Sequence, residues 1–181
     1  MADAHTANLS LYASSGERKY PNHAERQRAL AAMALLPPER ELFALTLAWT
    51  GARVSEVLDL RARSFQIERG VVSICTLKRR RHSVREVPIP PELTAALDAH
   101  FRLAEMQRNG ETADRRLWPW CRVTAWRFIK QLMNRAGIIG LPSCPRGLRH
   151  GFGVGTLQAG VPDPTWQFSF LPEFRRGHWR W

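Results

Sequence analysis

The chain has 181 residues, 44% of them apolar and 24% charged, which is typical of one folded domain and excludes a disordered chain. No apolar run reaches the roughly 18 residues of a membrane span, and residues 1–15 lack the layout of a signal peptide, so we expect a cytoplasmic protein with no membrane partner. Lysine and arginine outnumber aspartate and glutamate by 27 to 16, and the net charge of +11 predicts a nucleic-acid partner or else reflects an arginine-rich proteome.

The N-terminal part is predicted to form an arm and two helices. Residues 1–20 are polar and aperiodic, and we interpret them as a flexible arm. Good helix formers over 24–36 predict a first helix, which Pro37-Pro38 ends. Pro38 suits the first position of a second helix. We expect that helix to be central to the core because it is strongly apolar, with Leu42, Leu45, Leu47, Ala48 and Trp49.

A short helix is predicted after Thr50-Gly51, ending at Leu58. Arg53 lies beside its apolar residues. Two interpretations of this arginine are open. It is a surface residue paired with Glu56 at i+3, or it belongs to a site that binds an anion.

Three short antiparallel strands are predicted over 65–67, 71–74 and 84–89, where apolar and β-branched residues alternate with polar ones. The turn between the second and third strands is strongly cationic, with Lys78, Arg79, Arg80, Arg81, His82 and Arg85. Such a run is either a solvated loop or a hairpin tip that reaches along a phosphate backbone.

Two further helices and an aromatic segment follow the strands. Pro90-Pro91 opens a helix predicted to run to about Met106, and Leu117–Trp120 is expected to pack in the core. The helix predicted over 124–136 has an apolar side formed by Trp126, Ile129, Leu132 and Met133. Its other side, with Arg122, Arg127, Lys130 and Arg135, is either solvated or faces a DNA groove.

The last predicted helix runs from about Arg146 to Gln158 and begins with a cluster of cations. Arg146, Arg149 and His150 fall on its opening turns. A cationic helix start suits a phosphate ligand. Together with Arg53 and Lys78, these residues suggest a site that holds one phosphate.

Two motifs and their order resemble the tyrosine recombinases, the phage-integrase family. Thr50-Gly51-Ala52-Arg53-Val54-Ser55-Glu56 is similar to the first-arginine box of that family, and Pro145-Arg146-Gly147-Leu148-Arg149-His150 to its second-arginine box. The strands between them, with Lys78 and Val87-Pro88-Ile89, resemble the hairpin that carries the family's lysine. The resemblance covers residues 22–162 and implies an α+β, mainly α fold: a helical integrase-type catalytic domain with a small three-stranded antiparallel sheet.

The resemblance implies DNA strand breakage and rejoining in site-specific recombination or integration. A tyrosine hydroxyl of the family attacks a DNA phosphodiester, which leaves a 3′-phosphotyrosyl bond and a free 5′-hydroxyl. By resemblance, Arg53 and Arg149 stabilise the phosphate and Lys78 protonates the leaving oxygen. Arg146 and His150 complete the implied catalytic set. We expect DNA-binding roles for Arg79, Arg80, Arg81, His82, Arg127 and Lys130.

No metal or other cofactor is expected, because the phosphotyrosine stores the energy of the broken bond. The cysteines agree with this expectation, since Cys75, Cys121 and Cys144 are far apart and form no CxxC or CxxH pattern.

The chain departs from the family pattern in three ways. Arg146 stands where the family usually has histidine, and residues 1–20 are too short for the family's N-terminal DNA-clamping domain. The expected Leu-Gly-His motif would fall near Pro172 and the nucleophilic tyrosine near Trp181, but the tyrosines of the sequence are Tyr12 and Tyr20. We therefore interpret residues 21–162 as the catalytic core and 163–181 as an aberrant tail, the product of a frameshift or rearrangement.

Two functions remain open at this stage. The chain is a recombinase core that lacks its own nucleophile, with a tyrosine supplied by another recombinase protomer or not at all. Alternatively, it is a non-catalytic DNA-binding protein that occupies sites or partners an intact recombinase.

Overall fold

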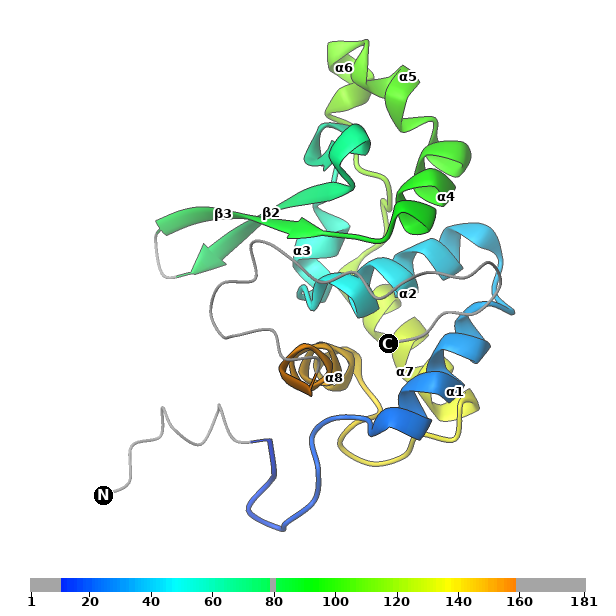
Figure 1. The fold of residues 1–181 in the computed structure, drawn as a ribbon, viewed down its shortest axis with the longest axis vertical. Helices are drawn as coiled ribbons and strands as arrows, with labels where there is room; N and C mark the ends of the chain where they lie inside the picture. The colour runs from blue at the N-terminus through cyan, green and yellow to red at the C-terminus, as the bar shows by residue number, and fades with distance from the viewer. Residues whose placement is uncertain (1–10, 79–80, 159–181) are drawn as a thin grey trace.

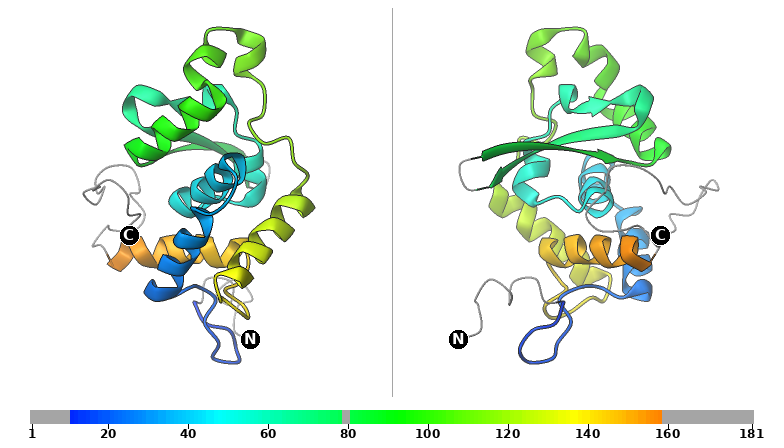
Figure 2. Two further views of the ribbon diagram at one scale, coloured as in Figure 1. Left: turned by 90° about the vertical axis from the view of Figure 1, so that its right-hand side faces the viewer. Right: turned by 60° about the vertical axis from the view of Figure 1, so that its left-hand side comes forward.

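The computed structural model describes residues 11–78 and 81–158, and within these ranges the chain forms a mainly helical fold with one small sheet (Figures 1 and 2). The helices are α1 (His23–Met33), α2 (Pro38–Thr50), α3 (Val54–Leu58), α4 (Pro91–Phe101), α5 (Leu103–Gln107), α6 (Gly110–Ala113), α7 (Arg122–Arg135) and α8 (Pro145–Gln158). The strands are β1 (Phe65–Gln66), β2 (Val71–Lys78) and β3 (Arg81–Pro88), with short 3₁₀ turns at Ala62–Ser64 and Ile67–Arg69. The predicted fold class is confirmed.

Helix α2 crosses the middle of the molecule, with the sheet and α4 to α6 on one side and α1, α7 and α8 on the other (Figure 1). Every residue from Leu42 to Thr50 is buried, as expected of a helix that is covered on all sides. The aromatic segment packs against it. Trp118 is fully buried, its ring centroid lies 5.4 Å from that of Phe43, and its Nε1–H donates to the Glu39 carbonyl oxygen at 3.1 Å.

The sheet has the order β1-β2-β3, and both pairs are antiparallel. Strands β2 and β3 are longer than predicted, since Lys78 pairs with Arg81 and Val71 with Pro88. Lys78, Arg81, His82 and Arg85 are therefore strand residues, and the prediction that they lie in the turn was wrong. Positions 79 and 80 are all that separates the two strands in the sequence. The four cationic or titratable residues just named therefore belong to the strands of the hairpin and not to a long loop.

Two helices differ from their predicted form. The helix predicted from Pro91 to Met106 is broken at Arg102, which adopts a left-handed φ of 58° and separates α4 from α5. On α7 the buried residues are Ala125, Ile129, Leu132 and Met133, whereas Trp126 is 42% exposed with the Lys130 Nζ 5.4 Å from its ring centroid. The prediction that Trp126 faces the core was wrong, because the buried side of α7 includes the neighbouring Ala125 and leaves Trp126 at its edge.

Residues 11–20, the second half of the predicted flexible arm, form a short turn attached to the domain. The Lys19 N–H donates to the Leu11 carbonyl oxygen at 2.9 Å, and the Leu141 N–H donates to the Glu17 carboxylate at 3.1 Å. Pro21, which follows this turn, is buried.

Among the helices that the structure describes, none is both long and apolar enough to span a membrane.

Candidate functional site

The first element of the site is the sharp turn that carries Arg53 from the end of α2 to the start of α3. Gly51 ends α2 with a left-handed φ of 56°, which favours glycine. A side chain here would also meet α8, because an added Cβ would lie 2.6 Å from the Phe152 ring. Arg53 then takes an extended conformation immediately before the first residue of α3. Glycine at position 51 thus allows the turn with Arg53 to pack directly against α8.

Glu56 is the centre of the site. Its side chain is only 6% exposed, yet it carries a carboxylate. The backbone N–H of Arg53 donates to Oε2 at 2.9 Å, as in a helix capping box, and Arg53 Nη1 donates to Oε1 at 2.8 Å. The interpretation of Arg53 as a partner of Glu56 is therefore correct, and the pair lies inside a larger cluster.

The β2–β3 hairpin supplies two more donors to Glu56. The Arg85 Nη2 donates to Oε2 at 2.8 Å, and the Thr76 hydroxyl donates to Oε1 at 3.2 Å. Arg85 Nη1 also contacts the Thr76 hydroxyl. Burial by itself raises the pKa of Glu56, but hydrogen bonds from Arg85 and Arg53 outweigh burial and hold this pKa at about 2.

Arg149 reaches the same carboxylate from α8. Its Nη1 lies 4.0 Å from Glu56 Oε2, beyond hydrogen-bonding distance, and this buried nitrogen has no hydrogen-bond partner among the residues that the structure describes. Burial and the neighbouring charge of Arg53 lower the pKa of Arg149 from its ordinary value. Arginine nevertheless stays charged at physiological pH. Arg149 thus forms a long ion pair with Glu56 but no hydrogen bond to it, and its buried Nη1 remains an unsatisfied donor within the described residues.

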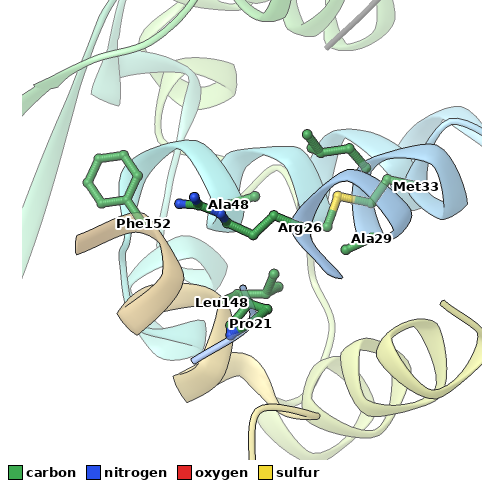
Figure 3. Close-up of a pocket in the computed structure, with 8 residues that line it drawn as sticks. Pro21, Arg26, Ala29, Met33, Ala48, Leu148 and Phe152 are labelled. Carbon is green, nitrogen blue, oxygen red and sulfur yellow. The ribbon is translucent and has the colours of Figure 1, made fainter. Parts of the chain in front are cut away.

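Two contacts fix the helix that carries Arg149. The buried Arg26 of α1 donates from Nη1 to the Gly151 carbonyl oxygen at 3.0 Å. In Figure 3, Arg26 extends from α1 toward α8, beside Leu148, Pro21 and Phe152. At the first turn of α8, Gly147 lies against the Pro142 carbonyl, where a Cβ would not fit. The site therefore depends on packing against α1 and on the loop before α8.

The hollow in Figure 3 lies between α1, α2 and α8 and is lined mainly by apolar side chains. It belongs to the packing of α8, and the arginine cluster does not line it.

His150 and Arg146 lie on the opening turns of α8 with Arg149. Burial lowers the pKa of His150, and the nearby cations Arg149 and Arg146 lower it further. His150 is therefore mostly neutral near pH 7, and a neutral imidazole can accept a proton. Arg146 is exposed and makes no bond to Glu56 in the described part of the chain.

Two of the other predicted residues lie outside this cluster, because Arg127 and Lys130 are exposed on α7. Lys78 is the last residue of β2, two positions after Thr76, and Arg81 and His82 begin β3. Arg79 and Arg80 lie outside the described residues. The roles predicted for these residues stay predictions.

Sequence reasoning missed two charged members of the site, Glu56 and Arg85. Glu56 was considered only as the surface partner of Arg53, and Arg85 only as part of a cationic turn. One signal was available for each. Glu56 is at the third position of α3, where a carboxylate can reach back to the N-cap. Arg85 is two residues before the buried Val87 and so lies on the same, inner face of β3, whereas Val84 and Glu86 are exposed.

Three guanidinium groups and one carboxylate give the cluster a net charge of about +2. Such a group attracts an anion, and guanidinium forks suit the oxygen atoms of a phosphate. Among the described residues, no group of three or more His, Cys, Asp or Glu side chains could hold a metal ion.

Solved structures with a similar fold are DNA recombinases. The crystal structure of XerA recombinase superposes with a TM-score of 0.62 at 23% identity, over 78% of this chain and 51% of that one. XerH site-specific recombinase bound to the palindromic difH substrate superposes with a TM-score of 0.62 at 19% identity. The match covers 81% of this chain and 44% of XerH. The Tn1549 transposon integrase bound to transposon right end DNA superposes with a TM-score of 0.60 at 18% identity. The match covers 83% of this chain and 57% of the integrase. The fold is that of a tyrosine-recombinase catalytic domain.

The sequence comparisons identify the family. Residues 22–168 match the phage integrase family, and the chain belongs to it. Tyrosine recombinase XerA of Thermococcus kodakarensis is 27% identical over 150 residues, which cover 80% of this chain and 51% of the relative. XerA of Pyrococcus furiosus is 29% identical over 129 residues, 66% of this chain and 41% of the relative. The chain thus spans about half the length of these relatives.

Proposed function

We propose that this chain holds a DNA phosphodiester in the manner of a tyrosine recombinase and takes part in site-specific recombination. The observation that carries the proposal is Arg149 Nη1, a buried cationic donor without a hydrogen-bond partner in the described part of the chain. A buried hydrogen-bond donor normally has an acceptor. Because Arg149 Nη1 has none among the described residues and lies in a cluster with two other arginines, an incoming anion would supply the missing acceptor. The family and the DNA-bound structures of its relatives support DNA as the source of that anion.

Each residue of the site has a role in this proposal. Arg53 and Arg149 approach the phosphate from α3 and α8 and bind its non-bridging oxygens, where negative charge grows as the phosphate becomes five-coordinate. Lys78 donates a proton to the leaving 5′-oxygen. His150, neutral at physiological pH, supports proton transfer at the phosphate, and Arg146 adds a cation where the family usually has histidine.

The arginine cluster lacks a nucleophilic tyrosine among the residues that the structure describes. The tyrosines of the sequence are Tyr12 and Tyr20, in and beside the turn that precedes α1. Their rings pack edge to face, with centroids 6.2 Å apart. Hydrogen bonding to Tyr12 and burial raise the pKa of Tyr20, so less of it is ionised at neutral pH. We therefore propose that this chain binds the phosphodiester without attacking it, and that any tyrosine comes from another recombinase protomer.

A second candidate is a non-catalytic DNA-binding protein that occupies recombination sites. The same observation on the tyrosines favours it. The two candidates differ in whether a covalent protein–DNA bond ever forms when an intact recombinase is present.

The test begins with a duplex selected from a random pool by the purified chain. We expect Arg149→Ala to weaken binding of that duplex by about tenfold, the effect of one lost charge-assisted contact. Arg108→Ala is the matched control, because it removes an exposed arginine near α5, far from α8 (Figure 1). Equal effects of the two substitutions would contradict an assembled phosphate site.

A nicked version of the selected duplex tests the chemistry, since a nick traps any covalent adduct. We expect no adduct resistant to denaturant from this chain alone. If the tyrosine acts in trans, we expect an adduct when a recombinase is added that keeps its tyrosine but has its own phosphate-binding arginines substituted. An adduct formed by this chain alone would refute the lack of a nucleophile. Its loss in Tyr12→Phe or Tyr20→Phe would then identify the attacking residue.

A further inference from the structure

The Glu56 carboxylate is saturated with donors. A carboxylate has about four lone-pair positions, two on each oxygen. Oε1 accepts from Arg53 Nη1 and the Thr76 hydroxyl, and Oε2 accepts from the Arg53 backbone N–H and Arg85 Nη2. No position is left for a fifth donor.

Arg85 and Arg149 approach the same oxygen of Glu56 from different elements. Arg85 Nη2, on β3, lies 2.8 Å from Oε2, and Arg149 Nη1, on α8, lies 4.0 Å from it. A shift of about 1 Å would bring Arg149 to the usual distance of roughly 2.8 Å for a charge-assisted bond. Attraction to a carboxylate that is nearly buried favours that shift. Arg85 occupies the position that Arg149 would otherwise take.

The contact with Thr76 holds Arg85 in this position. Nη1 of Arg85 contacts the Thr76 hydroxyl on the neighbouring strand, and Nη2 donates to the Glu56 carboxylate. The register places Arg85 opposite Ile74, two residues before Thr76 on β2. The guanidinium is thus held by Thr76 on β2 and by Glu56 on α3.

We propose that Arg85 is a positioning residue that keeps Arg149 off Glu56 and so leaves Arg149 available for a phosphate oxygen. The inference rests on the proposed phosphate-binding function. Without Arg85, Arg149 moves to hydrogen-bonding distance of Oε2, and its Nη1 then donates to Glu56 instead of to a phosphate oxygen. An incoming phosphate must then break a hydrogen-bonded ion pair, in place of the present pair at 4.0 Å, before it can bind.

The experiment follows the arginine side chains by NMR in protein labelled with ¹⁵N-arginine, before and after titration with inorganic phosphate. Arg85→Met is the test variant, and Arg69→Met is the matched control, because Arg69 bonds to Gln66 and not to Glu56. We expect the Arg149 guanidinium to rotate faster in the unmodified chain and in Arg69→Met, where it makes no hydrogen bond to Glu56, than in Arg85→Met. In Arg85→Met we expect the slowed rotation and shifted signals of an ion-paired guanidinium, before any phosphate is added.

Two further variants separate this effect from the loss of one charge or from misfolding. Arg85→Met combined with Glu56→Gln should release Arg149 again, because the carboxylate that captures it is gone. Thr76→Val removes one donor to Oε1 and the contact that holds Arg85, so it should produce the same Arg149 signature more weakly. We expect phosphate affinity to fall by about tenfold in Arg85→Met, the effect of one lost charge-assisted contact.

An Arg149 guanidinium whose signals do not change in either Arg85→Met or Thr76→Val would overturn the inference. So would an ion-paired signature that persists in the Arg85→Met, Glu56→Gln double variant. Failure of the proposed function looks different: phosphate would then shift neither Arg53 nor Arg149 in the unmodified chain.

Discussion

At the scale of single residues, a buried carboxylate organises this site. Glu56 is almost entirely buried, accepts four hydrogen bonds and lies 4.0 Å from a further arginine. A buried charge is costly unless it is fully paired, so the arginines and the threonine hydroxyl offset the desolvation of Glu56. The reverse also holds, because the carboxylate lets three guanidinium groups lie close together.

The pH dependence of stability tests this role of Glu56. Its pKa is about 2 in the folded chain and 4.5 ordinarily, so its ionised form favours folding. The contribution is complete above about pH 4.5 and is lost as the pH falls through about 2, a change on the order of 3 kcal/mol in the free energy of unfolding. Glu56→Gln should lack this component when urea unfolding is measured from pH 6 down to about 2.

Glu111→Gln provides the control, because Glu111 is exposed at the first turn of α6. Its unfolding free energy should follow that of the unmodified chain at every pH. The role assigned to Glu56 is wrong if Glu56→Gln and the unmodified chain lose stability in parallel over this range.

At the scale of elements, the site depends on how α8 meets the turn between α2 and α3. Phe152 packs on Gly51, and Arg26 bonds to the Gly151 carbonyl. These contacts set the separation of Arg53 and Arg149, which come from segments far apart in the sequence. Helix α8 packs against α2, so a change at the turn moves one arginine relative to the other.

Gly51→Ala tests this contact. The new Cβ would lie 2.6 Å from the Phe152 ring, and the left-handed φ of 56° disfavours any L side chain. We expect a loss of about 2 kcal/mol or more in the free energy of unfolding, the sum of backbone strain and a steric clash. Binding of the selected duplex should weaken as well, because Arg53 and Arg149 no longer keep their spacing.

Gly110→Ala is the matched glycine substitution. Gly110 begins α6, has no atom within 4 Å of an added Cβ, and has no positive φ. We expect a change within about 0.5 kcal/mol in urea unfolding and no change in DNA binding. A similar effect of both substitutions would show that the Gly51–Phe152 contact does not position the site.

At the scale of the whole molecule, the net charge of +11 predicts DNA binding that depends strongly on salt. The logarithm of the binding constant should fall linearly with the logarithm of salt concentration, with a slope of about −0.9 for each phosphate contacted. Arg79→Ala should reduce the magnitude of that slope by about one if the hairpin tip contacts DNA, whereas Arg108→Ala should leave it unchanged. Equal slopes for the two variants would argue against a DNA-contacting hairpin.

The sequence by itself determined most of the elements, because their signals are local. Apolar periodicity predicted α2 and α7, prolines marked the start of α2 and α4, and β-branched residues indicated the strands. Both arginine motifs could be recognised for the same reason, since each lies within one short segment. Arg102 shows the limit: it carries no glycine or proline signal, yet the chain turns there into a left-handed conformation.

Only the tertiary structure decided what surrounds the arginines. Thr76 and Arg85 are 20 and 29 residues from Glu56 in the chain, and Arg149 comes from the last described helix. No local pattern specifies which side chain fills which lone pair of a carboxylate, because that depends on how α3, the hairpin and α8 pack. The sequence therefore predicted that Arg53 and Arg149 belong to one site. Packing decided that Glu56 lies between them and that Arg85, rather than Arg149, binds it.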